Sequence, residues 1–301
     1  MTDNRYVVGA SVLLVLIYVL QFLTARSSLQ EHITPSGLAI LRFYAAGMLF
    51  MPYLCKAQSR ADIAELGAIK VLTLSMLAGF PYLVVMNIGI SLTSAGYVAT
   101  VGPGSIVLFS FVLPLLVLKE KSDGASVIST VMITIGILLF IYNSFLEQGL
   151  SPAGTALFVL QGLMFSLYGF LVRHWQVKPV LGAAVVSLGS CPPAFIAHAT
   201  TRTGFHDAAI AEILFQAFVQ GILAGAAAIF LYTYIVQKTG PQRASLVMPS
   251  VPIITTTAGY FLLDESLSLV QVIGLIAMAC GMSVPGLLAV RRRYQLKSTS
   301  G

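Results

Sequence analysis

Arg42 is the only charged residue that lies well inside one of the long apolar stretches of this sequence. It follows the start of the stretch 35–55 by about seven residues, which places it roughly 10 Å deep if this stretch is a membrane helix. A charge at that depth is costly unless it finds a partner or reaches the lipid headgroups. Two interpretations stay open: a structural role, by snorkelling or by bonding backbone carbonyls, and attraction of a carboxylate on a bound solute.

Uncharged polar side chains recur inside the other apolar stretches. A phenol or amide buried in hydrocarbon needs a partner, so each could join two helices or sit in an interfacial aromatic belt. As a set, they could instead line a neutral cavity with aromatic walls, which suits a zwitterionic or aromatic metabolite better than a bare ion. The set comprises Tyr82, Asn87, Tyr97, Gln161, Tyr168, Gln220, Tyr232 and Tyr234.

Groups that carry enzymatic or metal chemistry are missing from these stretches. All eleven Asp and Glu residues fall in tails, loops or stretch ends, and no HExxH, GxSxG or pair of intramembrane aspartates occurs. Cys55, Cys191 and Cys280 have neither CxxC spacing nor a histidine-rich neighbourhood. We therefore expect a protein that is not an enzyme and has no metal, disulfide or cofactor.

The composition indicates an integral membrane protein that is entirely α-helical. Hydrophobic residues make up 57% of the chain and charged residues 9%, whereas soluble domains carry about 25% charged residues. The first apolar run is too long for a signal peptide and is expected to be the first membrane helix. At roughly 20 residues per crossing, charges and turn residues divide the chain into ten expected helices, at about 6–25, 35–55, 71–91, 95–118, 124–145, 152–172, 179–199, 212–236, 242–263 and 268–290.

Prolines interrupt the expected fourth and ninth helices. Each proline removes a backbone donor and frees a carbonyl. Static kinks and hinges for a conformational change are both open interpretations, and the hinge role is favoured by the presence of such prolines in both helices. The candidates are Pro103 and Pro114 in the fourth helix, and Pro249 and Pro252 in the ninth.

The basic residues predict the orientation. With the N-terminus in the cytoplasm, fourteen of the seventeen Lys and Arg residues fall in inside segments and only Arg26 and Arg202 fall in outside loops. The last one, Arg42, lies within a helix. This asymmetry predicts an even number of crossings with both termini cytoplasmic. The net charge of +6 then serves topology and contact with anionic lipids rather than nucleic acid.

The expected fourth and ninth helices resemble each other. Pro103 precedes Glu120 by 17 residues, and Pro249 precedes Glu265 by 16. Each half would contain five helices, and because five is odd, the second half must be inverted relative to the first. The expected halves are 1–146 and 147–301. Inverted repeats with a binding site near the midplane are a recurrent design of secondary transporters.

With these features, and with Leu41-Arg42-Phe43 early in the second helix, the chain resembles the EamA family of the drug/metabolite transporter superfamily, including exporters of the YddG type. The resemblance implies ten helices in two inverted repeats in a bacterial cytoplasmic membrane. It also implies a central cavity that the first, third, fourth, sixth, eighth and ninth helices line. Tyr18 and Gln21 become candidate binding residues there, where many relatives have an early tryptophan in the first helix.

The resemblance further implies export of small metabolites by alternating access, with amino acids, including aromatic ones, as the expected substrates. The expected partners are a small molecule and the lipid bilayer, with no nucleic acid. The chain is expected to be a monomer or a weak homodimer, since the Gly221–Gly225 GxxxG motif permits close packing without proving a dimer. A quaternary-amine or multidrug efflux carrier, a non-transporting scaffold and a lipid flippase remain the alternatives.

The missing carboxylates yield a prediction about coupling. Proton-driven carriers usually keep a buried carboxylate as the relay, so transport by this chain is expected to proceed without obligatory proton coupling. Uptake of labelled substrate into proteoliposomes should have the same initial rate with and without an imposed pH gradient. Strong dependence on that gradient, with accumulation above equilibrium, would contradict the prediction.

Overall fold

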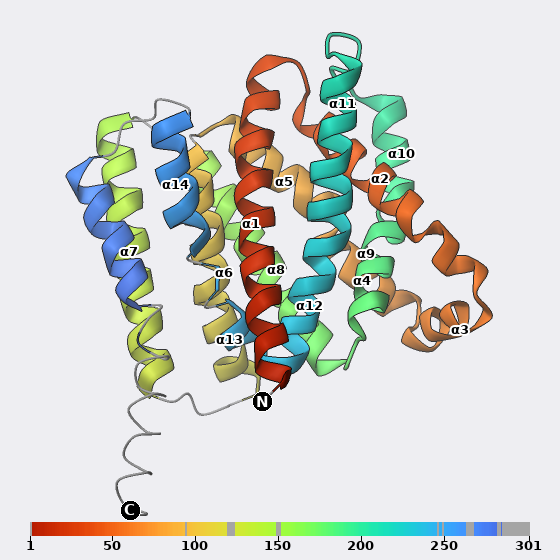
Figure 1. Cartoon of the computed structure of the whole chain (residues 1–301), viewed down its shortest axis with the longest axis horizontal. Helices are drawn as coiled ribbons and strands as arrows, with labels where there is room; N and C mark the ends of the chain where they lie inside the picture. The colour runs from red at the N-terminus through yellow and green to blue at the C-terminus, as the bar shows by residue number, and fades with distance from the viewer. Residues whose placement is uncertain are drawn as a thin grey trace, which may run out of the picture.

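The computed structural model describes residues 2–93, 95–118, 124–148, 152–245, 247–248, 250–262, 268–281 and 284. Within these ranges every regular element is a helix and none is a strand. The helices stand side by side and many run between the same two ends of the molecule (Figure 1). They are α1 (Thr2–Glu31), α2 (Pro35–Cys55), α3 (Ala57–Leu66), α4 (Ala68–Ala78), α5 (Phe80–Ser91), α6 (Ala95–Leu118), α7 (Gly124–Gln148), α8 (Pro152–His174), α9 (Pro179–Gly189), α10 (Cys191–Thr200), α11 (Ile210–Gln216), η1 (Ala217–Ala227), α12 (Ala228–Thr239), α13 (Pro241–Ser245) and α14 (Ser250–Leu262).

Six helical stretches in the described part of the chain are long and apolar enough to cross a membrane. Each overlaps one of the expected crossings, and they are Arg5–Glu31, Pro35–Cys55, Ala68–Ser91, Pro152–His174, Pro179–Thr200 and Ile210–Thr239. Shorter apolar helices at Val101–Pro114, Val127–Leu139 and Leu269–Gly281 overlap three more. The expected single helix 242–263 is wrong, because α13 and α14 are separate and a turn at 247–248 lies between them.

Two of the crossings are broken in the middle, and the breaks pack against each other. One lies at Gly79, just before Pro81, and the other at Ser190, just before two prolines. The Ser190 hydroxyl accepts a hydrogen bond from the Phe80 amide at 3.0 Å, and the Ser75 hydroxyl donates to the Val185 carbonyl at 3.1 Å. Side chains from each break therefore satisfy the backbone of the other, as a bilayer interior requires.

The membrane-length stretch Ile210–Thr239 contains a π-helical segment, η1, which packs closely on α2. A Cβ atom added at Gly221 would lie 2.4 Å from the Ala45 Cβ and 3.1 Å from the Arg42 carbonyl oxygen. At Gly225 it would lie 3.1 Å from both Ala46 and the Arg42 side chain. The GxxxG motif thus serves a contact within the chain, in which two small residues let the backbones of α2 and η1 approach each other.

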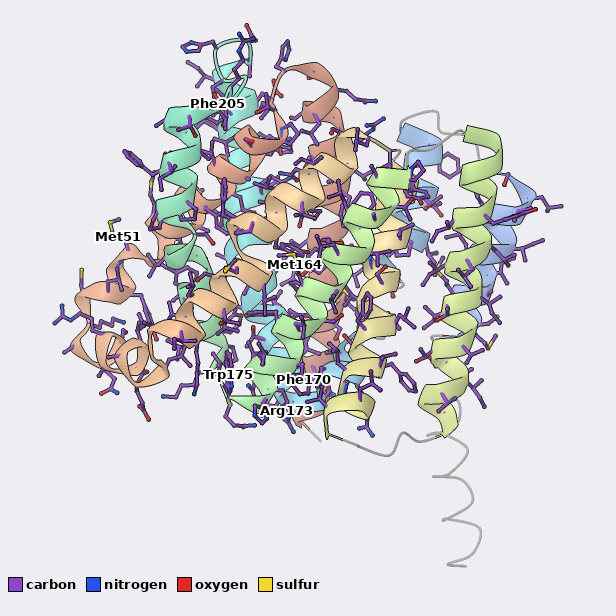
Figure 2. All side chains as sticks on the ribbon, turned by 180° about the vertical axis from the view of Figure 1, so that it is seen from behind. Met51, Met164, Phe170, Arg173, Trp175 and Phe205 are labelled. Carbon is purple, nitrogen blue, oxygen red and sulfur yellow. The ribbon has the colours of Figure 1, made fainter. Side chains whose placement is uncertain are left out.

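The basic segments of the described chain gather at one end of the molecule, which is called here the basic end. There Lys178 pairs with Asp62 at 3.6 Å, Lys70 lies 5.4 Å from the ring centre of Trp175, and the Arg173 guanidinium donates to the Gln237 carbonyl. The N-terminus lies at this end (Figure 1), and Trp175 and Arg173 lie far from Phe205 (Figure 2). The arrangement agrees with the charge asymmetry in the sequence.

The close contact between η1 and α2 predicts a stability difference between two glycines. Gly221→Ala should lower the free energy of unfolding by about 1–3 kcal/mol, because its new methyl group overlaps Ala45. Gly9→Ala, at a position where an added Cβ meets nothing within 4 Å, should be neutral or slightly stabilising. Thermal unfolding in detergent measures both. The double variant Gly221→Ala/Ala45→Gly should recover most of the loss, and no recovery would show that this contact does not determine the effect.

Candidate functional site

Arg42 is buried among α2, η1 and the neighbouring helices, with 2% of its surface exposed. One terminal nitrogen, Nη2, donates to the Ala224 carbonyl at 2.7 Å. The other, Nη1, is fully buried and has no hydrogen-bonding partner in the described part of the chain. The side chain bonds a backbone carbonyl in the interior instead of extending to the headgroups. The second terminal nitrogen thus remains a buried charged donor without a partner among the described residues.

Aromatic rings from α5, α8 and α12 pack together beside this arginine. Phe165 lies at their centre, with ring-centre distances of 5.5 Å to Tyr82, 5.7 Å to Tyr168 and 4.5 Å to Tyr232. The phenols of Tyr82 and of Tyr18, on α1, lie within electrostatic range of the guanidinium. We call Tyr18, Arg42, Tyr82, Phe165, Tyr168 and Tyr232, with Gln161 and with Gln21, which follows Tyr18 by one turn of α1, the central cluster.

Hydrogen bonds satisfy only part of this cluster. The Gln161 amide donates to the Tyr82 hydroxyl at 2.6 Å, and the hydroxyls of Tyr168 and Thr233 are 2.8 Å apart. The side-chain oxygens of Gln21 and Gln161 are buried and accept no hydrogen bond from the described residues. Buried polar atoms are seldom left unpaired. A buried cationic donor and two amide acceptors therefore point to a ligand with a negative group and hydrogen-bond donors.

Glycines on neighbouring helices make room for this cluster. A Cβ atom at Gly102 would lie 2.7 Å from the Gln161 side-chain oxygen, and one at Gly169 would lie 2.5 Å from the Tyr232 hydroxyl. Substitution at either position would push a polar group out of its place. Gly102 lies on α6, just before Pro103. Because Gly102 has no side chain, α6, the fourth predicted crossing, meets Gln161 with its backbone rather than with a polar side chain.

Other residues in the predicted set lie elsewhere. Asn87 donates to the Pro35 carbonyl at 2.9 Å, which joins α5 to the start of α2. Tyr97 and Thr155 join α6 to α8 through hydroxyls that are 2.5 Å apart. Tyr234 lines a groove between α1 and α12, away from the central cluster. These side chains connect helices, or face a groove, rather than complete the cluster.

The predicted hinge prolines that the structure describes occupy two different settings. Pro103 and Pro114 are buried within the continuous helix α6, and Pro252 lies in the first turn of α14. A proline in a first turn displaces no helical hydrogen bond. Pro249 lies outside the described residues. No motion is defined at any of them, so the hinge role stays a prediction.

A chain of buried polar groups leads from the cluster to the end opposite the basic end. The Gln220 amide donates to the Gln21 carbonyl at 3.2 Å and to the Gln216 side chain at 3.4 Å. Gln216 donates to Ser28 at 2.8 Å, and Ser28 donates to Glu212 at 2.8 Å. We call this contact between α1 and α11–η1 the polar seam.

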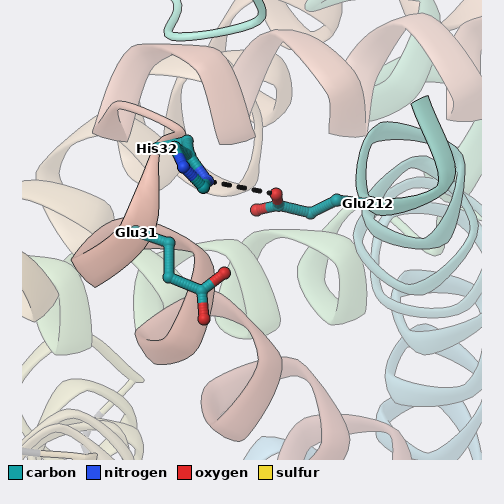
Figure 3. Close-up of side chains that lie close together, drawn as sticks. All are labelled: Glu31, His32 and Glu212. Carbon is teal, nitrogen blue, oxygen red and sulfur yellow. Dashed lines mark ion pairs between the residues drawn. The ribbon is translucent and has the colours of Figure 1, made fainter. Parts of the chain in front are cut away.

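Glu212 ends the seam at the surface, where it pairs with His32 at 3.5 Å, beside Glu31 (Figure 3). The ligand atoms of these three residues lie within 4.8 Å of one another, so the group could hold a metal ion. However, both glutamates are at least partly exposed, and the carboxylate of Glu212 already has Ser28 and His32 as partners. The pairing of Glu212 with Ser28 and His32 thus ends the line of hydrogen bonds at the surface.

The sequence carries a signal for this seam in the spacing of its polar residues. Glu212, Gln216, Gln220 and Ala224 follow one another at intervals of four residues, which places them along one helical face. On α1, Tyr18, Gln21 and Ser28 share a face through intervals of three and seven residues. Phe165, at the centre of the aromatic rings, could not be predicted in this way, because an apolar side chain in an apolar helix carries no local signal of function.

Comparisons with known proteins agree with the helical architecture. A family model described as "EamA-like transporter family" matches residues 6–142 and 152–284. No curated protein matches the chain. A solved structure described as "Crystal structure of protein" superposes with a TM-score of 0.68 at 19% sequence identity, over 95% of this chain and 98% of that one. At this identity the superposition indicates a shared fold and nothing about substrate.

Proposed function

The chain belongs to the EamA-like transporter family, and from that premise we propose that it carries amino acids, aromatic ones among them, across a bacterial cytoplasmic membrane. The observation that carries the proposal is the buried Nη1 of Arg42, which has no partner among the described residues. A carboxylate is the natural complement of a guanidinium, because their hydrogen bonds are charge-assisted. A cationic drug would instead meet the positive charge of this side chain.

The rest of the central cluster complements the other parts of an amino acid. The side-chain oxygens of Gln21 and Gln161 can accept hydrogen bonds from an ammonium group. The rings of Tyr82, Phe165 and Tyr232 offer aromatic surfaces against which an aromatic side chain can pack. Tyr18 and Tyr168 lie in the same cluster and supply further hydroxyls.

For the architecture, we infer ten crossings in two inverted five-helix repeats, 1–146 and 147–301, with both termini in the cytoplasm. Support comes from the family match over two separate halves of similar length. Further support comes from the basic segments, which gather at one end. The basic end would then face the cytoplasm, and the polar seam would lead to the opposite side.

For the mechanism, we infer alternating access with the polar seam as the outer gate. The side chains of the cluster are almost fully buried, with Gln161 and Arg42 each 2% exposed and Tyr232 0% exposed. A solute can reach them only if helices separate. The hydrogen bonds of the seam hold α1 against α11–η1, and exchange of these bonds with water or solute would open the path outward. π-Helical segments often occur at functional sites, and η1 lies directly beside this path.

A counterflow assay tests the substrate. Proteoliposomes containing the full chain are loaded with an unlabelled compound and given its labelled form, across a panel of amino acids, sugars and quaternary amines. We expect exchange of amino acids, fastest for aromatic ones. Arg42→Gln should reduce this exchange by about tenfold or more, which corresponds to the loss of a hydrogen bond to a charged group.

Two further variants separate binding from folding in this assay. Arg42→Lys keeps the charge and should retain part of the activity, whereas Arg60→Gln removes an exposed arginine at the basic end and should behave like the wild type. Size-exclusion profiles and thermal unfolding identify variants that misfold. Exchange of no amino acid, or full activity in a folded Arg42→Gln protein, would refute the proposal.

A further inference from the structure

Two grooves flank the half of α1 that lies at the basic end. One, of about 430 Å³, runs between α1 and α12, and the other, of about 380 Å³, runs between α1 and α14. α1 lies between these two partners (Figure 1). No member of the central cluster lines either groove. Both therefore face the surroundings of the helix bundle rather than the proposed solute site.

The two grooves differ in their polar groups. The α1–α12 groove has apolar walls that include Leu13 and Phe230, and its lining also includes the guanidinium of Arg5 and the phenols of Tyr6 and Tyr234. Among the described residues, the lining of the α1–α14 groove includes Ser11 and Ser250 as its polar members and no charged one. Basic side chains near the membrane surface attract anionic headgroups, and tyrosines favour headgroup depth. The α1–α12 groove therefore complements an anionic headgroup, whereas the α1–α14 groove, of similar size and on the same helix, offers no such charge.

Gly9 lies in the wall of the α1–α12 groove and leaves it open. A Cβ atom added at Gly9 would meet no atom within 4 Å, unlike one at Gly221 in the contact between η1 and α2. The glycine is therefore not required for helix packing. Its missing side chain instead adds depth to the apolar part of the groove, beyond the charged end at Arg5.

We propose that the α1–α12 groove binds an anionic phospholipid. Its phosphate group interacts with Arg5, and an acyl chain lies along Gly9, Leu13 and Phe230. The lipid is a bound partner rather than cargo, since the groove does not include the central cluster. The proposal does not depend on the identity of the transported solute, because it concerns a different face of α1.

Native mass spectrometry of the full chain, titrated in detergent with phosphatidylglycerol or with phosphatidylcholine, tests this proposal. The wild type should retain phosphatidylglycerol with higher affinity. Arg5→Gln should weaken that binding by about fivefold, the ratio expected for one basic group at an anionic surface, and should leave phosphatidylcholine unaffected. Gly9→Leu fills the groove and should weaken the binding of both lipids.

Two matched controls make the result specific. Arg60→Gln removes a different exposed arginine at the basic end, and Ser11→Leu fills the α1–α14 groove. Both should retain the lipid preference of the wild type. Unchanged phosphatidylglycerol binding in Arg5→Gln would overturn the headgroup assignment. Unchanged binding in Gly9→Leu, or an equal loss in Arg60→Gln, would overturn the assignment of the lipid to this groove.

Discussion

The hydrogen bond from Arg42 to the Ala224 carbonyl is the contact on which the interior of this protein depends. A guanidinium inside a bilayer is stable only with a partner, and η1 supplies one because Gly221 and Gly225 let α2 approach it closely. The bond uses one terminal nitrogen and leaves the other unpaired. The arrangement that makes the arginine tolerable in the membrane therefore also leaves it the free donor on which the proposed function rests.

The polar seam begins near this contact and runs between α1 and α11–η1, whereas the Arg42 hydrogen bond joins α2 to η1. Gln21 on α1 meets Gln220 on η1, and the hydrogen bonds continue through Gln216 and Ser28 to Glu212. Ala224, which accepts the Arg42 hydrogen bond, thus lies on the same helical face as Gln220, Gln216 and Glu212. Under the proposed function, this continuity gives a physical reason for a solute at Arg42 to affect the contact between α1 and α11–η1, because Gln21 takes part in both through different atoms.

Sequence patterns could predict the class of this fold and part of its site. Long apolar runs and basic flanks predicted the helical stretches, and Arg42, Tyr82, Gln161 and Tyr232 stood out as polar groups in apolar surroundings. Prolines mark the breaks at Gly79 and Ser190 in the sequence, but the packing of one break against the other could not be predicted, because it depends on serines from distant helices. The role of Phe165 depends on three rings that only tertiary packing brings together.

The central claim is that a solute reaches the Arg42 cluster from the outer side only when the polar seam opens. Its most direct test is counterflow in a Ser28→Cys/Glu212→Cys protein whose Cys55, Cys191 and Cys280 have been replaced, treated with a short bis-methanethiosulfonate cross-linker. The account predicts that cross-linking stops exchange and that cleavage of the cross-link with a thiol reductant restores it. The same reagent should not change exchange by the Ser28→Cys or Glu212→Cys single variants. Full exchange in the cross-linked protein would contradict it.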